Sequence, residues 1–257
     1  MNVNLLGISI GNTRTRLGVF VDGKLTETDT YENRHAERLS EAIERAFTPL
    51  REREDAIVLM SSVKPQLNAS IAQMVTDALA QSPRWVERDV PIPIGRRLDP
   101  EAMVGEDRLL NAAAAYDVMK QACVVIDAGT AITIDLVDGD GTFHGGAIAP
   151  GAQMMLDALN QRTAQLPEVA FDAPSEAVGH NTIEAMRVGA FYGLRGMVRE
   201  LVEEYAQALG AYPAVIATGG DGSLLFHEYE LVDRVVPDLT LMGLAVTLRY
   251  AMQGEQD

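Results

Sequence analysis

The chain has 257 residues, 47% of them hydrophobic, and a mean hydropathy of +0.01, which is typical of a globular protein with a substantial core. Its 37 acidic and 21 basic residues give a net charge of −16, so the surface repels nucleic-acid backbones and anionic lipids and argues against both as partners. The single cysteine, Cys123, cannot form an internal disulfide, and neither a signal-like N-terminus nor a run of eighteen apolar residues is present, so we expect a cytoplasmic protein.

The first predicted elements form a hairpin whose plan returns in the second half of the chain. An apolar strand and a glycine-containing turn over 5–13 lead into a second strand over 15–21, which ends at Asp22-Gly23. Asp-Gly between alternating strands is a hairpin signal. The same plan recurs at 124–137 and ends at a turn over 138–141. This internal repeat predicts two similar α/β lobes, residues 1–118 and 119–257.

Helical and extended patterns connect the two hairpins and follow the second one. The expected elements, in chain order, are a helix over 36–50, a strand over 56–61, a helix over 66–81, an extended stretch over 90–100, a helix over 107–120, a turn at 150–151 and a helix over 152–162. The last elements expected are a strand over 214–217, a turn over 218–222 and a helix over 240–252.

A long helix is predicted to begin at Asn181-Thr182-Ile183-Glu184, because a short polar residue followed by Glu three positions on is typical of a capping box. This helix carries Gly189, Gly193 and Gly196 on one face. Each glycine costs a helix about 1 kcal/mol relative to alanine, so three of them indicate close approach by another element. Both tight packing against the sheet and a subunit contact remain open.

Three glycine-containing turns predict a nucleotide site. The turn Gly11-Asn12-Thr13-Arg14 can point N–H groups and hydroxyls at a phosphate, although alone it is better explained as an ordinary polar hairpin. The motif Asp127-Ala128-Gly129-Thr130 repeats it, and Thr218-Gly219-Gly220-Asp221 follows a third strand, where a base and ribose could lie. No Gly-x-x-x-x-Gly-Lys-Ser/Thr motif is present. This plan is typical of the actin and sugar-kinase superfamily, with two ribonuclease-H-like lobes and an interlobe nucleotide cleft.

Within that superfamily the sequence resembles the type III pantothenate kinases over almost its whole length. The shared motifs, in order, are Ile10-Gly11-Asn12-Thr13, Ser61-Ser62-Val63-Lys64-Pro65, Gly105-Glu106-Asp107-Arg108, Asp127 to Thr133, Gly145 to Gly151, Thr163 to Pro167, Asn181-Thr182, Thr218-Gly219-Gly220 and Leu239 to Leu244. The resemblance implies ATP-dependent phosphorylation of pantothenate to 4′-phosphopantothenate, the first step toward coenzyme A. It also implies Mg²⁺, a monovalent cation (K⁺ or NH₄⁺) and a homodimer in which the partner subunit completes the pantothenate site.

Asp107, at the predicted start of a helix, is the candidate catalytic residue. A carboxylate there is stabilised in its ionised form and can accept a proton from an alcohol. The resemblance implies that Asp107 is the base for the primary hydroxyl of pantothenate and that the substrate site includes Gly105, Glu106, Asp107, Arg108 and Thr182. In the alternative interpretation Asp107 only caps the helix and Arg108 is a solvated ion-pair partner.

The resemblance also assigns residues to the nucleotide and the cation. It implies that Asp127 binds the monovalent cation; for an isolated Asp-x-Gly-Thr motif, the default explanation is an Asp that stabilises its own turn. Thr182 is expected near the anionic substrate at a helix N-terminus, a role compatible with capping. The residues expected to contact ATP are Ser9, Ile10, Gly11, Asn12, Thr13, Arg14, Thr15, Arg16, Thr130, Gly219 and Gly220.

The sequence departs from the family at Ser9, where members carry Asp in the order Asp-x-Gly-Asn-Thr. In phosphoryl transfer a carboxylate there helps to orient the divalent cation, and a serine hydroxyl brings no charge. Three interpretations follow: an active kinase that holds magnesium through ATP oxygens and other acids, a weakened kinase, or a non-catalytic ligand-binding or regulatory paralogue.

Overall fold

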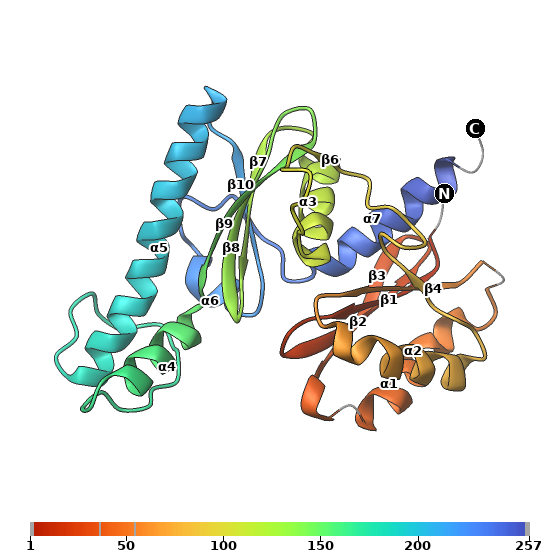
Figure 1. The fold of residues 1–257 in the computed structure, drawn as a ribbon, viewed down its shortest axis with the longest axis horizontal. Coiled ribbons are helices and arrows are strands. Elements are labelled where there is room, and N and C mark those ends of the chain that lie inside the picture. The colour runs from red at the N-terminus through yellow and green to blue at the C-terminus, as the bar shows by residue number, and fades with distance from the viewer. Residues whose placement is uncertain (1–2, 36, 54, 255–257) are drawn as a thin grey trace. The chain divides into compact units, whose positions relative to one another are not determined.

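The computed structural model describes residues 3–35, 37–53 and 55–254, and the chain forms two compact units (Figure 1). The first unit contains residues 1–94, 99–117 and 239–257, and the second contains 95–98 and 118–238. Both units therefore consist of segments that are discontinuous in sequence.

The first unit has a five-stranded sheet in the order β3-β2-β1-β4-β5. Strands β1 (Leu5–Ile10), β2 (Arg14–Val21) and β3 (Lys24–Glu32) are antiparallel, whereas β4 (Ile57–Ser62) is parallel to β1 and β5 (Arg84–Trp85) to β4. Its helices are α1 (Glu37–Phe47), α2 (Pro65–Leu79), α3 (Glu106–Met119) and α7 (Leu239–Gly254), with short 3₁₀ turns at Asn33–His35 and Thr48–Leu50.

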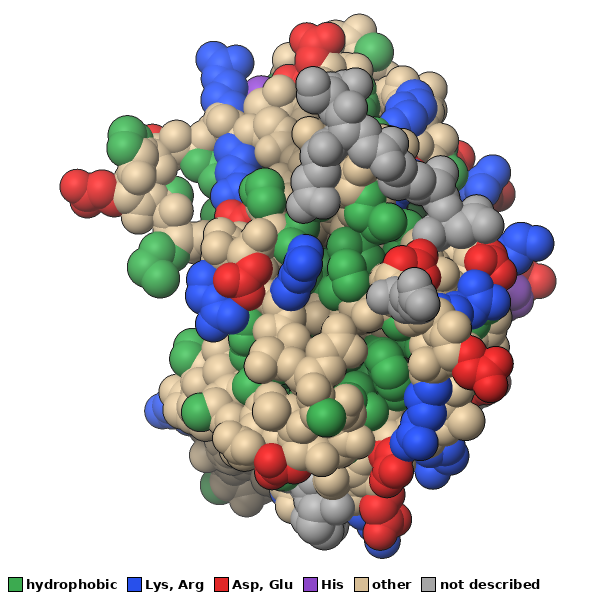
Figure 2. All heavy atoms as spheres, turned by 90° about the vertical axis from the view of Figure 1, so that its right-hand side faces the viewer, with side chains coloured by type: hydrophobic (Ala, Val, Ile, Leu, Met, Phe, Trp, Pro, Cys, Tyr) green, Lys and Arg blue, Asp and Glu red, His purple; other side chains and the backbone are tan. Residues whose placement is uncertain are grey.

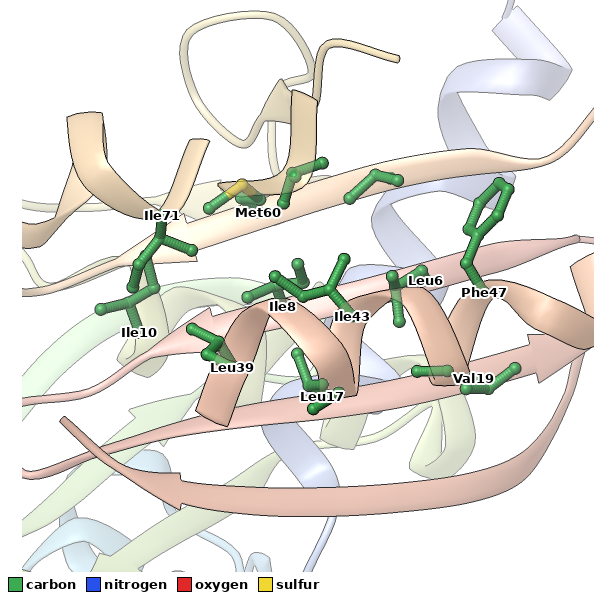
Figure 3. Close-up of a cluster of buried hydrophobic side chains, with 14 of the residues drawn as sticks. Leu6, Ile8, Ile10, Leu17, Val19, Leu39, Ile43, Phe47, Met60 and Ile71 are labelled. Carbon is green, nitrogen blue, oxygen red and sulfur yellow. The ribbon is translucent and has the colours of Figure 1, made fainter. Parts of the chain in front are cut away.

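The core of the first unit lies between its sheet and helices α1 and α2 (Figure 3). The side chains of Leu39 and Ile43 on α1 contact a layer made by alternate residues of β1, Leu6, Ile8 and Ile10. Residues at positions i, i+2 and i+4 of a strand share a face, so Gly7 and Ser9 lie on the opposite face. That opposite face is covered by α7: a Cβ at Gly7 would lie 3.1 Å from Cδ1 of Leu244.

The second unit has a six-stranded sheet in the order β11-β10-β7-β8-β9-β6. Strands β7 (Cys123–Ala128), β8 (Ala131–Val137) and β9 (Thr142–Pro150) are antiparallel. Strands β10 (Ala214–Thr218), β11 (Arg234–Val235) and β6 (Gly95–Arg96) pair in parallel with β7, β10 and β9 respectively. The helices are α4 (Ala152–Arg162), α5 (Thr182–Leu209) and α6 (Gly222–Phe226), and the core includes Phe191, Leu194 and Val198 of α5.

The predicted internal repeat is confirmed by the topology. The strand order β3-β2-β1-β4-β5 in the first unit corresponds to β9-β8-β7-β10-β11 in the second. Both predicted Asp-Gly turns form: Asp22 and Gly23 adopt positive φ values of 52° and 78° between β2 and β3, and residues 138–141 connect β8 to β9. Cys123 is fully buried in β7 as expected, and burial raises the pKa of its thiol to about 12.

The two units differ from the expected lobes, residues 1–118 and 119–257, mainly in the segments 95–98 and 239–257. Helix α7, at the C-terminal end, packs on the first unit. On the face of the sheet opposite α1 and α2, Gly7 and Gly18 make room for the side chains of Leu244 and Leu241. The short segment 95–98 joins the second unit through the pairing of β6 with β9. Long-range complementarity of this kind leaves no local pattern in the sequence.

The predicted turn after β10 forms at residues 219–221, and the short helix α6, which the sequence does not predict, follows it at once. One local expectation differs from the structure: a Cβ at Gly189, Gly193 or Gly196 would meet nothing within 4 Å, so the interpretation that this glycine face packs against the sheet is wrong. The predicted first residue of the helix over 36–50, Ala36, lies outside the described residues.

Within the described ranges, no helix is both long and apolar enough to cross a membrane. Acidic and basic side chains are interspersed on the face drawn in Figure 2, so the net negative charge is not gathered there into a single patch.

Candidate active site

The turn between β1 and β2 is held in place by side chains that donate hydrogen bonds to its carbonyl oxygens. The Gly11 N–H donates to the Arg14 carbonyl oxygen at 2.9 Å, and a Cβ at Gly11 would lie 3.0 Å from that oxygen, which explains the glycine. Asn33 Nδ2 donates to the carbonyl oxygens of Gly11 and Asn12 at 2.8 and 3.1 Å, and Lys64 Nζ donates to that of Asn12 at 2.9 Å. These hydrogen bonds fix the conformation of the turn.

The residues expected to contact ATP at this turn differ in exposure. The side chains of Asn12, Thr13 and Arg14 are exposed, and Ser9 and Arg16 are partly buried. Ile10 belongs to the hydrophobic core, and the buried Thr15 hydroxyl donates to Asn33 Oδ1 at 2.8 Å. The side chains of Ile10 and Thr15 are therefore part of the protein interior next to the turn and are not available to contact ATP.

The second hairpin and the glycine-rich turn after β10 lie against each other within the second unit. Gly219 has a φ of +91°, and a Cβ there would lie 2.3 Å from the Ala128 carbonyl oxygen and 2.5 Å from Asp127 Oδ1. The N–H of Asp221 donates to the Ala128 carbonyl oxygen at 2.9 Å. The exposed Thr130 begins the return into β8. The structure therefore brings Asp127 next to Gly219, with Thr130 three residues further along the same hairpin.

The candidate base Asp107 lies in the first turn of α3, where a carboxylate interacts favourably with the helix dipole. Its Oδ1 accepts a hydrogen bond from the Arg108 N–H at 2.8 Å. A Cβ at Gly105 would lie 2.5 Å from the same oxygen, so a side chain there would displace this carboxylate.

Glu106, next to Asp107, is tied to the end of β4. Its Oε2 accepts a hydrogen bond from the Ser62 N–H at 2.8 Å. Burial raises the pKa of Glu106, the Ser62 hydrogen bond opposes that shift, and the nearby charges of Glu87 and Asp107 add to it. This half-buried carboxyl group thus lies among other acids at the carboxyl end of the strand.

Thr182 lies in the second unit, at the first position of α5. The cap is made by Asn181, whose side chain accepts from the Glu184 N–H at 2.9 Å, while the Glu184 carboxylate accepts from the His180 N–H at 2.8 Å. The predicted capping box is confirmed in a variant form, with Glu184 reaching one residue further back than usual. The Thr182 side chain is exposed.

The divalent and monovalent cations implied by the resemblance would need carboxylate and other oxygen ligands. Among the described residues, no group of three or more His, Cys, Asp or Glu side chains could hold a metal ion. Mg²⁺ in kinases is commonly bound by one or two carboxylates together with phosphate oxygens and water, so a larger cluster of acids is not needed.

The sequence alone predicts no role for Asn33 or for the Lys64 side chain, although Lys64 lies in one of the shared motifs. Both side chains donate hydrogen bonds to the turn between β1 and β2, because Asn33 follows the end of β3 and Lys64 follows the end of β4, and these strand ends lie beside that turn. No local signal predicts that arrangement.

The fold, in which one hairpin plan recurs in both units, is that of the actin and sugar-kinase proteins. The solved structure of MreB5 of Spiroplasma citri bound to ADP superposes with a TM-score of 0.54 and 11% identity, covering 98% of each chain, which shows the fold alone.

The family model described as Type III pantothenate kinase matches residues 5–204, and this chain belongs to that family. A Type III pantothenate kinase of Dehalococcoides mccartyi is 34% identical over 246 residues, or 93% of each chain. Another, of Rhodospirillum rubrum, is 36% identical over 253 residues, which cover 95% of this chain and 98% of the relative.

Proposed function

We propose that this protein phosphorylates pantothenate with ATP to give 4′-phosphopantothenate, the first step toward coenzyme A. Membership of the family supports the reaction, and the observation that carries it is Asp107, a carboxylate at a helix start for which Gly105 makes room. The buried cysteine and the absence of a predicted disulfide fit a cytoplasmic enzyme.

Asp107 acts as the base in this proposal. Its carboxylate takes the proton of the primary hydroxyl as the hydroxyl oxygen forms a bond to the γ-phosphorus. The bond from that phosphorus to the β–γ bridging oxygen breaks, and ADP leaves with the electron pair. Arg108 and Thr182 contribute to binding of the anionic substrate.

The glycine-containing turns hold the nucleotide. The exposed Asn12, Thr13 and Arg14 and the exposed Thr130 contact the phosphates, and the Gly219-Gly220 turn receives the base and ribose. Mg²⁺ supplies positive charge that stabilises the phosphate oxygens during transfer. The preorganisation of the first turn by Asn33 and Lys64 supports this assignment.

A coupled assay of ADP release tests the function and the cation site together. We expect pantothenate-dependent ADP release that is higher in K⁺ than in Na⁺ at equal ionic strength, because Asp127 would hold the monovalent cation against phosphate oxygens. Asp127→Asn should lower turnover in K⁺ and remove the difference between the two salts. If Asp127 only stabilises its turn, Asp127→Asn would instead lower the melting temperature and leave the ratio of the rates in K⁺ and Na⁺ unchanged. No pantothenate-dependent turnover at any ATP concentration would remove the kinase proposal in favour of a binding protein.

The glycine face of α5 supports a homodimer. Gly189, Gly193 and Gly196 are exposed, and so is Tyr192 with 44% of its surface accessible. We expect light scattering at micromolar concentration to give twice the chain mass of 27.8 kDa.

A substitution on the glycine face of α5 tests whether this face forms the dimer interface. Gly193→Arg should leave the protomer folded, because its Cβ would meet nothing within 4 Å, but should shift the mass toward that of the monomer. Gln207→Arg, at an exposed position of the same helix, is the matched control and should remain dimeric. A wild-type monomer, or a dimer indifferent to Gly193→Arg, contradicts this interface.

A further inference from the structure

We infer that Glu106 supplies, from the start of α3, the carboxylate that position 9 lacks, and that it orients the divalent cation bound to the nucleotide. This role differs from the substrate contact that the family resemblance implies for the segment Gly105 to Arg108. It rests on the proposed kinase function, and it selects the first of the three interpretations of Ser9, an active kinase that uses another acid.

The strand register places Ser9 at the same edge of the sheet as Ser62, the residue whose N–H group donates to Glu106. Because β1 and β4 are parallel, their carboxyl ends meet there: Ser9 pairs with Ser61 and Ile10 with Ser62. The Val63 N–H continues the ladder by donating to the Ile10 carbonyl oxygen at 3.0 Å. The Ser62 N–H donates to Glu106 Oε2 at 2.8 Å, so the carboxylate is held one residue beyond the level of Ser9.

Glu106 approaches from the face of the sheet to which Ser9 belongs. Ile10 lies in the core under α1 and α2, so Ser9 and Ser61 lie on the other face. Helix α7 covers that face through Leu244 at Gly7, and α3 packs closely on α7, since a Cβ at Gly243 would lie 2.4 Å from the Leu110 carbonyl oxygen. The start of α3 therefore lies on the side where the family carboxylate would project.

The charge of Glu106 lacks compensation by a basic side chain. Its hydrogen bond comes from a neutral backbone N–H, and no Lys or Arg among the described residues pairs with it. Glu87 and Asp107, the charged groups that act on it, are both acidic. A half-buried carboxylate among other acids favours a bound cation, because a cation offsets both its desolvation and their mutual repulsion.

A second observation at the same place points to a ligand. The Ser61 hydroxyl is buried, with the residue 1% exposed, and finds no hydrogen-bond partner among the described atoms. Buried hydroxyls without a partner are costly and uncommon. A hydrated divalent cation held at Glu106 would bring water molecules to this edge, and Mg²⁺ commonly keeps several of its waters.

The alternative is that Glu106 only fastens α3 to β4 through Ser62. Glu106→Gln separates the two roles, because the amide oxygen still accepts from the Ser62 N–H while the negative charge is lost. A purely structural Glu106 would leave cation affinity unchanged in this variant.

The test measures Mn²⁺ affinity by electron paramagnetic resonance in the presence of a non-hydrolysable ATP analogue and without pantothenate. The proteins compared are wild type, E106Q, S9D and S9D/E106Q. We expect E106Q to weaken Mn²⁺ binding about 10-fold or more, as loss of a metal-orienting group commonly does. S9D should add little in the wild type but should recover most of the loss in the E106Q background. Such non-additivity is the signature of two groups that serve the same purpose.

Two results would overturn the inference. One is Mn²⁺ affinity of E106Q equal to that of the wild type with an unchanged melting temperature; the other is an equal gain from S9D with and without Glu106. If E106Q folds poorly, S9D alone decides: a gain of about 10-fold or more with Glu106 in place means that the carboxylate is still missing. Because turnover is not measured, failure of the pantothenate kinase proposal would be seen separately in the ADP-release assay.

Discussion

Asp107→Asn is expected to lower kcat for pantothenate phosphorylation by about 10²-fold or more, because a positioned general base commonly contributes 10² to 10⁴-fold. The amide has nearly the shape of the carboxylate and can still accept the hydrogen bond from the Arg108 N–H, so the start of α3 should keep its geometry. What is lost is the ability to take the hydroxyl proton. The measurement is initial-rate kinetics with pantothenate and ATP varied in turn.

The competing explanation, a helix cap, predicts a different pattern. Loss of a cap costs about 0.5–2 kcal/mol of stability and leaves chemistry unaffected. Asp107→Asn should therefore change kcat far more than the free energy of unfolding in urea. Glu101→Gln is the matched control, since this exposed acid lies in the loop before α3 and its loss should change neither quantity. A loss in kcat of less than tenfold in the Asp107 variant would contradict the role of base.

The repeated hairpins and the ends of several helices could be predicted because local chemistry determines them. The boundaries of α4 are those expected, and α5 begins where Asn181 and Glu184 predict. Strands β5 and β11 could not be predicted, because each has two residues and shows no alternation, and β6 could be predicted only as part of an extended stretch over 90–100. Their pairing depends on partners distant in sequence.

The candidate site was predictable at its loops but not at its supports. The residues of the glycine-containing turns follow from the motifs. The sequence does not reveal that the buried Thr15 hydroxyl donates to Asn33, or that the Lys64 ammonium group donates to the Asn12 carbonyl oxygen. The departure at Ser9 was visible, whereas Glu106 as its replacement depends on the Ser62 hydrogen bond between α3 and β4. Side-chain contacts across elements require the fold.

Gly219→Ala should both destabilise the second unit and damage nucleotide binding. The residue has a φ of +91°, which an L side chain rarely adopts, and its new methyl would lie 2.3 Å from the Ala128 carbonyl oxygen and 2.5 Å from Asp127 Oδ1. Overpacking costs about 1–3 kcal/mol and the backbone strain adds to that. At about 2–4 °C per kcal/mol, the melting temperature should fall by several degrees.

The same displacement moves the two segments that would hold the nucleotide. To relieve the clash, the turn after β10 must shift away from Asp127 and Ala128, which also strains the hydrogen bond from the Asp221 N–H to the Ala128 carbonyl oxygen. A shift near 1 Å can cost about 10²-fold in rate, so we expect a large rise in KM for ATP and a smaller thermal stabilisation by an ATP analogue.

Gly222→Ala is the control for this prediction. It lies in the same segment, but the nearest atom to its Cβ is Val235 Cγ1 at 4.0 Å and its φ is not positive, so alanine fits. We expect near wild-type melting and KM for this variant. If Gly219→Ala lowers the melting temperature but leaves KM for ATP equal to that of the Gly222 control, the turn is a structural element of the second unit. The adenosine of ATP would then have to be bound elsewhere.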